Sequence, residues 1–535
     1  MKKSFLFFFL YLAALHGDEC DILIPCLRGI FLSSPCEEEE EIPCEGGIWE
    51  KGLCLSDREF AKLEKRLINR YLDQPLSVEG IHFLKKDILE FYRSIGRPIV
   101  IVQIPEQDIT LEVLVVEIQE SKVGDLCVIG ANWSSPNRIL NFVRVRDDGL
   151  IDSRRLATDL AWLNQNPYRS VNAVFKAGRQ PCTTDIELLV CEKRPYSVFA
   201  GTDNTGFRET GYVNVFAGFN WGNVFGLGHI LSYEYIISTE FNRYQGHAVN
   251  YIAPLPWRHT FQVFGGYSFV HVPHLQKTFK NHGKSLQVSG RYQIPLPSYR
   301  DFLQEFRFGA DYKHTNNSVE FGGFNIINHY VNILQAMAGY KFTYQSCASK
   351  AYFDLEAFGS PCRWLPDMSP HYYSELRADA KPWYIYARGT FTYQYKLPKQ
   401  FLTDFRLRGQ LSSANLLPSE QMGLGGYNTV RGYLERQVNV DDALIANLEF
   451  RTPTWCPFRR DAFVLLAFAD YALGVQHERQ SFEKQVYNLL GVGPGIRYQI
   501  DHWFLLRADL GCRLIKTQND ASHSVRVHFG AVLNY

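Results

Sequence analysis

The sequence predicts a mostly β protein, in which a 16-stranded transmembrane antiparallel β-barrel follows two small α+β domains of β-α-α-β-β order. Three observations support this fold class. The chain is rich in aromatic residues and glycine but lacks long apolar runs, its residues alternate in polarity from position 196 onward, and its predicted connections alternate in length.

The composition excludes a helical membrane protein. Of 535 residues, 14% are aromatic and 40 are glycine, yet beyond about the first 15 residues no apolar run approaches the roughly 20 residues that a spanning helix needs. The strands of a transmembrane barrel alternate lipid-facing and lumen-facing residues, which keeps mean hydropathy low. Composition alone also fits a soluble all-β protein. Basic and acidic residues are equal in number, 56 of each, and give no indication of a nucleic-acid partner.

Residues 1–17 predict a secretory signal peptide. Lys2 and Lys3 precede an apolar run that is too short to span a bilayer, and smaller residues follow it. We expect cleavage between about Ala14 and Asp18. The mature chain would then be exported to a compartment in which its cysteines can form disulfides.

Residues 18–46 are predicted to form a cysteine- and glutamate-rich linker. Five cysteines occur here and just beyond without a Cys-x-x-Cys pair, so disulfides are favoured over a zinc site. Because five is odd, at least one of them pairs elsewhere or stays free. The five are Cys20, Cys26, Cys36, Cys44 and Cys54.

The first small domain is predicted over 47–124. Ser56 is a candidate N-cap for the first of two helices, and one face of the second helix is apolar at helical spacing. The predicted elements are a strand at 47–51, helices at 57–72 and 78–95, and strands at 99–104 and 111–118.

The second small domain is predicted over 125–195 and has the same order of elements. Two consecutive units of about 70 residues with one element order form an internal repeat. The predicted elements are a strand at 126–129, helices at 137–142 and 153–164, and strands at 171–176 and 185–190.

The barrel is predicted over 196–535. Segments such as 212–216 and 384–391 alternate polar and apolar residues, and the chain divides into about sixteen such strands, the last over 525–535. An even number of strands allows a bacterial barrel to close without leaving an unpaired edge in lipid.

The predicted connections are short after even-numbered strands, as at 257–258 and 501–502. Those after odd-numbered strands are mostly longer and reach about 24 residues at 359–382 and about 30 at 413–442. Short periplasmic turns opposite long extracellular loops are typical of outer-membrane barrels, whereas a soluble sandwich has no reason to sort its loops in this way. The sequence therefore predicts a bacterial outer-membrane protein whose two small domains lie in the periplasm.

One long loop contains the run LGGYNTVRGY over 424–433. Arg431 is the one formal charge in that run, and Asp470 lies in an apolar stretch two strands further on. A loop tip inside the lumen needs a partner for its guanidinium, and a bidentate Arg431–Asp470 pair would supply one. A surface hairpin with an exposed arginine is an equally good interpretation of these residues.

Together these motifs resemble the haemolysin secretion/activation family of two-partner secretion, within the superfamily of barrels that carry POTRA domains. The run VRGY at 430–433 resembles the family's pore loop, PEQDI at 105–109 its Pro-x-Gln-Asp turn, and LNQNPYR at 163–169 a segment of its second domain. The resemblance extends from about residue 50 to the C-terminus. Further matches are Thr184-Asp185-Ile186, Pro195 and Asp203-Asn204-Thr205-Gly206.

The resemblance implies a pore loop held by an ion pair. The tip of the sixth extracellular loop would fold into the pore, and an acidic side chain would bind its arginine. The implied tip residues are Val430, Arg431, Gly432 and Tyr433, and the implied acidic partner is Asp470.

The resemblance also implies two POTRA domains that capture an unfolded exoprotein and pass it to the barrel for secretion. A sheet edge with free N–H and C=O groups can bind an extended client by β-augmentation. The implied partners are a β-helical exoprotein with a secretion domain, outer-membrane lipid and the barrel assembly machinery. The POTRA motif residues are Pro105, Gln107, Asp108, Leu163, Asn164, Asn166, Pro167, Tyr168 and Arg169.

Two features of the small domains differ from the family or leave alternatives open. After Gln107 and Asp108 the family usually has a glycine in the turn, which this chain lacks, so client contacts there are expected to differ. Cys127 and Cys191 lie on strands expected to be neighbours. A disulfide between them and two free thiols are equally compatible with that placement.

Two other functions share parts of this pattern. An outer-membrane insertase of the same superfamily would have the arginine loop but usually more POTRA domains, and a passive porin would explain the barrel but neither the repeats nor the loop. No catalytic residue, cofactor, metal ion or nucleic-acid partner is expected, and the sequence does not identify the client.

Overall fold

The computed structural model describes residues 22–35, 46–145, 149–207, 209–272, 282–299, 302–317, 326–361, 364–458, 460–479, 483–517 and 524–535. Contacts divide the chain into two compact units, Met1–Lys193 and Arg194–Tyr535. The predicted signal peptide lies outside the described residues. Within those ranges, every helix is too short or too polar to cross a bilayer.

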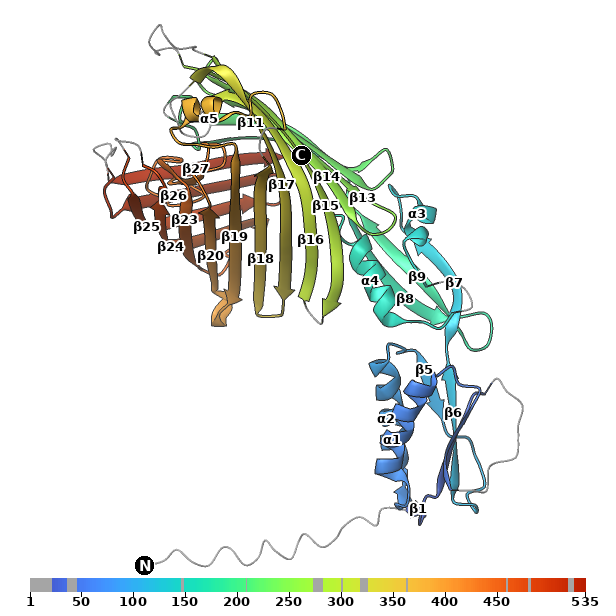
Figure 1. The fold of residues 1–535 in the computed structure, drawn as a ribbon. Helices are drawn as coiled ribbons and strands as arrows, with labels where there is room; N and C mark the ends of the chain where they lie inside the picture. The colour runs from blue at the N-terminus through green and yellow to red at the C-terminus, as the bar shows by residue number, and fades with distance from the viewer. Residues whose placement is uncertain are drawn as a thin grey trace, which may run out of the picture. The chain divides into compact units, whose positions relative to one another are not determined.

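The first small domain packs two helices against a four-stranded sheet of order β3-β2-β6-β5 (Figure 1). The helices and the inward face of the sheet share one apolar core, to which Leu63, Leu84 and Val116 contribute fully buried side chains. The elements are β1 (Ile22–Ile24), β2 (Gly29–Ser33), β3 (Gly47–Lys51), α1 (Asp57–Tyr71), β4 (Leu76–Ser77), α2 (Val78–Ser94), β5 (Val100–Gln103) and β6 (Val113–Glu120).

The prediction of a linker over 18–46 is wrong for much of its described part. β2 lies between β3 and β6 and pairs in parallel with both, and its Ile30 and Leu32 are fully buried. The strand predicted at 47–51 is present as β3 and lies at the edge of the sheet. The sequence obscured β2 because its five residues lie in a cysteine- and proline-interrupted segment and one of its two partners, β6, is distant in sequence.

Both predicted helices begin where their capping residues indicate. The Glu59 carboxylate accepts a hydrogen bond from the Ser56 backbone N–H at 3.0 Å, and the Ser77 hydroxyl accepts one from Gly80 N–H at 3.1 Å. Such bonds satisfy polar groups that a helix N-terminus otherwise leaves without partners. The first helix therefore starts at Asp57 and the second at Val78, as predicted.

Asp87 joins the two helices of the first domain through a nearly buried carboxylate. Its oxygens accept hydrogen bonds from the Tyr71 hydroxyl at 2.7 Å, from Arg70 at 2.7 Å and from Arg66 at 2.9 Å. Burial alone would raise the pKa of Asp87, but the bonds from Tyr71 and Arg70 and the charge of Arg66 outweigh it and lower the pKa below its ordinary value.

Replacing Asp87 with asparagine is expected to destabilise this helix pair by about 2 kcal/mol near neutral pH, since bonds to a charged group are lost while both arginines remain partly exposed. A carboxyl group whose pKa is lower in the folded than in the unfolded state, where it is about 4, stabilises the folded state at pH values above 4. This contribution is lost as the pH falls through the pKa of the folded state. Hydrogen-exchange protection factors of α1 and α2 in the full-length protein should therefore differ between parent and variant at pH 6 and converge as the pH falls below about 4. A difference independent of pH would assign the effect to packing instead.

The second small domain has a three-stranded sheet of order β7-β9-β8. β7 and β9 pair in parallel, and β8 and β9 pair antiparallel. β7 begins at Lys122, before the boundary predicted at 124. The elements are β7 (Lys122–Ile129), α3 (Pro136–Asn141), α4 (Ser153–Leu163), β8 (Arg169–Ala177) and β9 (Thr183–Glu192).

Cys127 and Cys191 lie on neighbouring strands, as expected, but both are free thiols. Cys127 is paired with Glu187, so Cys191 lies four residues further along β9. At about 3.3 Å per residue this offset is roughly 13 Å, whereas a disulfide requires Cα atoms within about 7 Å. Of the five cysteines near the N-terminus, Cys26 and Cys54 are free thiols, and the other three lie outside the described residues.

The second unit is a closed barrel of sixteen strands, as predicted, in which each strand pairs with the next along the chain (Figure 1). β10 closes the barrel against β27 through five residue pairs, from Phe199↔Asn534 to Asp203↔Gly530. Asn204 extends this seam, since its side chain bonds Val527 C=O at 2.7 Å and Phe529 N–H at 2.9 Å.

The barrel strands are β10 (Tyr196–Asp203), β11 (Asn214–Val224), β12 (His229–Ser238), β13 (Tyr244–Pro254), β14 (Thr260–His271), β15 (His282–Tyr299), β16 (Phe302–Asn317), β17 (Ile326–Gln345), β18 (Ser349–Pro361), β19 (Trp383–Lys396), β20 (Leu402–Ser412), β23 (Asp442–Arg451), β24 (Asp461–Val475), β25 (Val486–Ile500), β26 (Phe504–Arg513) and β27 (Val525–Asn534). Short turns at one end include 346–348 and 501–503, and the connections at the other end include 362–382, with helix α5 (Pro370–Leu376), and 413–441. The predicted asymmetry of connection length is therefore present.

Candidate functional site

The connection between β20 and β23, residues 413–441, is here named the inner loop. Two short strands, β21 (Met422–Leu424) and β22 (Val438–Val440), pair antiparallel and lead to its tip. At the tip Val430 and Tyr433 are almost completely buried and Arg431 is 3% exposed. The tip contacts inward-facing residues of the barrel wall, so the alternative of a surface hairpin with an exposed arginine is wrong.

The structure brings Arg431 and Asp470 together. Arg431 Nε lies 2.7 Å from Asp470 Oδ2, Nη2 lies 2.9 Å from Oδ1, and the Arg431 backbone N–H donates to Oδ2 at 3.1 Å. Both side chains are buried. Two parallel charge-assisted bonds fix the orientation of the guanidinium as well as its position.

Two further carboxylates lie against the same guanidinium. Arg431 Nη1 is 2.7 Å from Glu449 Oε1 and 3.4 Å from Asp509 Oδ2. The Phe468 ring also lies close, with its centroid 3.5 Å from Arg431 Cζ, a cation–π contact that is strengthened by exclusion of water. Arg431, Glu449, Asp470 and Asp509 are here named the tip cluster.

The three acids of the tip cluster depend on Arg431 to different extents. Glu449 also pairs with Arg451 at 2.6 Å, and Asp509 pairs with Arg497 at 2.6 Å. Among the described residues Asp470 has no second cation within ion-pair distance, although Asn447 donates a hydrogen bond to it at 2.8 Å. Loss of Arg431 would therefore leave Asp470 as the least compensated buried charge.

The sequence indicated Asp470 but neither Glu449 nor Asp509. Each lies on an inward-facing position of a strand: Glu449 is paired with Phe468, two residues from Asp470, and Asp509 is paired with Gly495. An acidic residue at an inward-facing position of a predicted strand can be recognised in the sequence as a candidate partner for a cation in the lumen. Its convergence on Arg431, however, becomes visible only when the register of four successive strands is known.

Glycines in the wall make room for the loop tip. A Cβ at Gly491 would lie 1.9 Å from the Arg431 carbonyl oxygen, and one at Gly511 would lie 2.3 Å from Gly432 N. Gly432 itself has φ +98°, which glycine adopts without strain. The run at 491–495 lies within β25, and of its three glycines Gly491 is the one that lets the loop backbone approach the wall closely.

A second buried cluster holds the base of the inner loop. The Arg377 guanidinium, from the connection that carries α5, binds both carboxylate oxygens of Asp441 and lies 2.8 Å from Gln476 Oε1. It also donates to the Leu416 carbonyl at 2.7 Å. Arg377, Asp441 and Gln476 are here named the base cluster. The sequence did not indicate it, because its members come from three different connections.

Between these clusters, Glu420 of the inner loop is bound to the barrel wall. Its fully buried carboxylate is 2.6 Å from Lys313 Nζ on β16 and accepts a bond from the Tyr386 hydroxyl at 2.7 Å. Gln335 also donates to it at 3.3 Å. The inner loop is thus held at its tip, its middle and its base by buried polar contacts.

The motif residues of the first domain fix a turn beside the sheet. The Gln107 side-chain amide donates to the Val115 carbonyl at 2.9 Å and accepts from Val115 N–H at 2.6 Å, so it continues the pairing of β6 beyond the end of β5. It also bonds the Pro105 carbonyl at 3.2 Å. Asp108 accepts a bond from Thr110 N–H at 2.9 Å and stabilises the next turn.

The motif residues of the second domain have a similar structural role. The Asn164 side chain donates to the Val171 carbonyl at 3.0 Å and accepts from Val171 N–H at 2.6 Å. The Arg169 guanidinium binds the Leu163 carbonyl at 3.0 and 3.2 Å.

The remaining motif residues complete the turn between α4 and β8, in which Pro167 also lies. Asn166 Oδ1 accepts a hydrogen bond from Tyr168 N–H at 3.0 Å. The Tyr168 carbonyl accepts one from Lys193 N–H at 2.8 Å. The motif thus ties α4 to the first residues of β8 and to the end of β9. In the described ranges, no three His, Cys, Asp or Glu side chains are grouped so that they could hold a metal ion.

Comparison with known proteins places this architecture among outer-membrane transporters. The model of the family described as haemolysin secretion/activation protein ShlB/FhaC/HecB matches residues 183–498. The heme/hemopexin transporter protein HuxB of Haemophilus influenzae is 23% identical over 447 residues, which cover 80% of this chain and 76% of that protein.

Solved structures share the fold at low sequence identity. CdiB from Escherichia coli superposes with a TM-score of 0.75 at 15% identity, covering 98% of this chain and 92% of that chain. CdiB from Acinetobacter baumannii gives a TM-score of 0.66 at 15% identity, covering 96% and 90%. At these identities the superpositions establish the fold alone.

Proposed function

Because this chain belongs to the haemolysin secretion/activation family, we propose that it secretes its partner exoprotein by a division of labour between two POTRA domains, a barrel and the inner loop. The protein is an outer-membrane transporter of two-partner secretion whose POTRA domains lie in the periplasm. In the proposal the POTRA sheets capture the unfolded client, and the inner loop leaves the lumen to let it pass. The proposal contains no catalytic step.

The observation that carries this proposal is the buried attachment of the inner loop. A client chain can use the lumen only if the loop moves, and the loop is held by ionic and hydrogen-bonded contacts that a competing chain or a conformational change can exchange. A passive porin gives no reason for a lumen occupied in this way. In the proposal, folding of a β-helical client outside the cell supplies the direction of transport, since no ATP is available at this membrane.

The second POTRA sheet offers an edge for an extended client. Val171 directs both backbone polar groups away from β9, because both bond Asn164. In an antiparallel strand every second residue points to the same side, so Ala173 and Phe175 also direct N–H and C=O outward. Among the described residues β8 pairs with β9 alone, so neither residue has a backbone partner on the outward side. Asn164 thus occupies the first position of the edge, and the next positions remain for β-augmentation.

Replacing Phe175 with proline is expected to reduce secretion at least several-fold, because proline removes the outward N–H that a client strand would accept from. Phe175→Ala keeps that N–H and is the matched control, so it should secrete close to the parental level. The measurement is the amount of exoprotein in the medium, normalised to the amount of folded barrel in the outer membrane. Equal losses in both variants would assign the effect to the 41% exposed phenyl ring and not to strand pairing.

The test of the function as a whole is proteomic. Surface, medium and outer-membrane fractions are compared between cells that carry this protein and cells that lack it. Loss of one large exoprotein from the surface and medium is expected and identifies the client. Depletion of many barrel proteins from the outer membrane would instead indicate an insertase, and no change in any fraction would indicate a pore for small solutes. Outer-membrane lipid and the barrel assembly machinery complete the set of proposed partners.

A further inference from the structure

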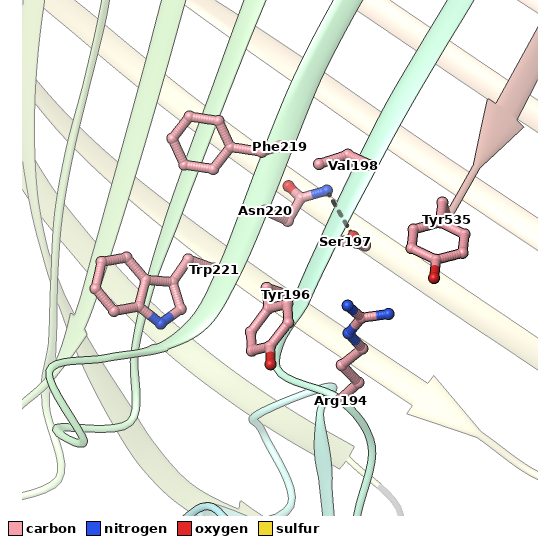
Figure 2. A pocket seen from close by; sticks show the side chains of 8 residues that line it. All are labelled: Arg194, Tyr196, Ser197, Val198, Phe219, Asn220, Trp221 and Tyr535. Atoms are coloured by element: carbon pink, nitrogen blue, oxygen red, sulfur yellow. Dashed lines mark hydrogen bonds between the residues drawn. The ribbon is translucent and has the colours of Figure 1, made fainter.

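The outer face of the barrel has a hollow of about 330 Å³ beside the seam between its first and last strands. It lies at the end where β10 begins and β27 ends, which is the end of the short turns. Figure 2 shows the side chains that line it, which come from β10, β11, Tyr535 and Arg194, two residues before β10. Six of them are Arg194, Tyr196, Val198, Phe219, Trp221 and Tyr535.

The apolar part of this hollow faces away from the lumen. Tyr196 is paired with Trp221 across the two strands, and Val198 with Phe219, so these four side chains share one face. Val198 is 54% and Phe219 38% exposed, although both belong to paired strands of the closed barrel wall. In a transmembrane barrel such a face contacts lipid acyl chains.

The end of the barrel at which the hollow lies is marked as the membrane–water interface. Exposed tryptophans occupy three of its short turns, Trp257, Trp455 and Trp503. Tryptophan and tyrosine concentrate where their apolar bodies contact acyl chains and their polar groups reach the head groups. Trp221 and the tyrosines of the hollow lie at the same end, which places the hollow at the depth of lipid head groups.

Arg194 gives the hollow a fixed positive charge. Its guanidinium carbon lies 4.8 Å from the centroid of the Tyr196 ring and 5.2 Å from that of Tyr535, and Figure 2 shows the guanidinium between the two rings. No carboxylate is within ion-pair distance of it in the described part of the chain. A guanidinium has five N–H groups, more than the two tyrosines engage, so N–H groups remain for a bidentate acceptor such as a phosphodiester.

We propose that this hollow is a binding site for one glycerophospholipid of the periplasmic leaflet. The Arg194 guanidinium donates to the lipid phosphate, the Tyr196 and Tyr535 rings hold the guanidinium in place, and an acyl chain lies along Val198 and Phe219. Because Tyr196 starts β10 and Tyr535 follows β27, the lipid contacts both strands of the closing seam. Charge complementarity and membrane depth together select a phospholipid as the occupant.

The test uses the full-length protein, purified in detergent, depleted of lipid and titrated with dioleoyl-phosphatidylglycerol while bound lipids are counted by native mass spectrometry. Arg194→Gln is expected to weaken retention of the most tightly held lipid by about threefold to tenfold. Lys399→Gln removes a cation from the turn between β19 and β20 and should bind like the parent. Heat-modifiable migration on gels verifies that each barrel is folded.

Two further probes separate a lipid site from a general anion site. Dioleoylglycerol has the same acyl chains without phosphate, so it should bind parent and Arg194→Gln equally. Glycerol 3-phosphate has a phosphate without acyl chains and should fail to displace the bound lipid at millimolar concentration. Equal retention of phosphatidylglycerol by parent and Arg194→Gln would overturn the proposal, as would displacement of the lipid by glycerol 3-phosphate.

Discussion

Replacing Arg431 with alanine is expected to raise the ionic conductance of the barrel and to reduce secretion. The substitution leaves Asp470 buried without a cation, and breaking a buried pair in this way costs about 3–5 kcal/mol. At about 1.4 kcal/mol per factor of ten, the ratio of bound to unbound loop tip falls by roughly a hundredfold or more. The unbound tip stays covalently attached inside the lumen, where it admits ions but obstructs a passing client.

Single-channel recording in planar lipid bilayers measures this effect directly as the fraction of time spent in open states. Arg479→Ala is the matched control, because it removes an exposed arginine from the connection between β24 and β25. A double variant of Arg431→Ala and Asp470→Ala should recover part of the closed population, since it removes the buried unpaired charge. Unchanged conductance in Arg431→Ala would mean that other contacts hold the tip.

An independent variant displaces the tip without changing any charge. The Cβ of Gly491→Ala would lie 1.9 Å from the Arg431 carbonyl oxygen, so loop and wall cannot keep their present separation. The same rise in open fraction is therefore expected. If Arg431→Ala opens the channel and Gly491→Ala does not, the conductance depends on charge in the lumen and not on the position of the loop.

The sequence predicted the barrel and most of its accessory elements because the signals for them are local. Alternation with a period of two marks each strand without reference to its neighbours, and connection length separates the two ends of the barrel. Helix starts at Ser56 and Ser77 are visible in a few residues. β2 was missed because a five-residue parallel strand carries little local signal and one of its two partners, β6, is far away in the sequence.

The part of the functional site that depends on the register between strands could not be predicted from the sequence. Arg431 and Asp470 stood out because each is an isolated charge among apolar or glycine-rich neighbours. Glu449 and Asp509 lie among other charged residues, and their approach to Arg431 follows from cross-strand pairing that no single segment reveals. The same limit explains Cys127 and Cys191, whose strands were correctly expected to be neighbours but whose four-residue offset could not be read from either strand.

Replacing Arg377 with alanine is expected to free the base of the inner loop while the tip remains bound. Asp441 is completely buried, so the loss is again about 3–5 kcal/mol, although Leu416 N–H still donates to it at 2.9 Å. Hydrogen exchange should rise over α5 and over 413–424, with little change in mean conductance. Arg479→Ala again serves as the control for loss of an arginine, and unchanged exchange would show that Arg377 does not hold the base.

The combined variant of Arg377→Ala and Arg431→Ala tests whether the two clusters act together. While one end of the loop is bound, the other remains at a high effective concentration near its site and rebinds readily. Losing either cluster alone is therefore partly compensated, whereas losing both removes this advantage. The open fraction of the double variant should exceed the value obtained by adding the changes in the free energy of loop release measured for the two single variants. The difference between the observed and the added free energies, the coupling energy, should exceed about 0.5 kcal/mol. Strict additivity would mean that tip and base detach independently, and the transporter could then move its loop tip without disturbing the extracellular connections.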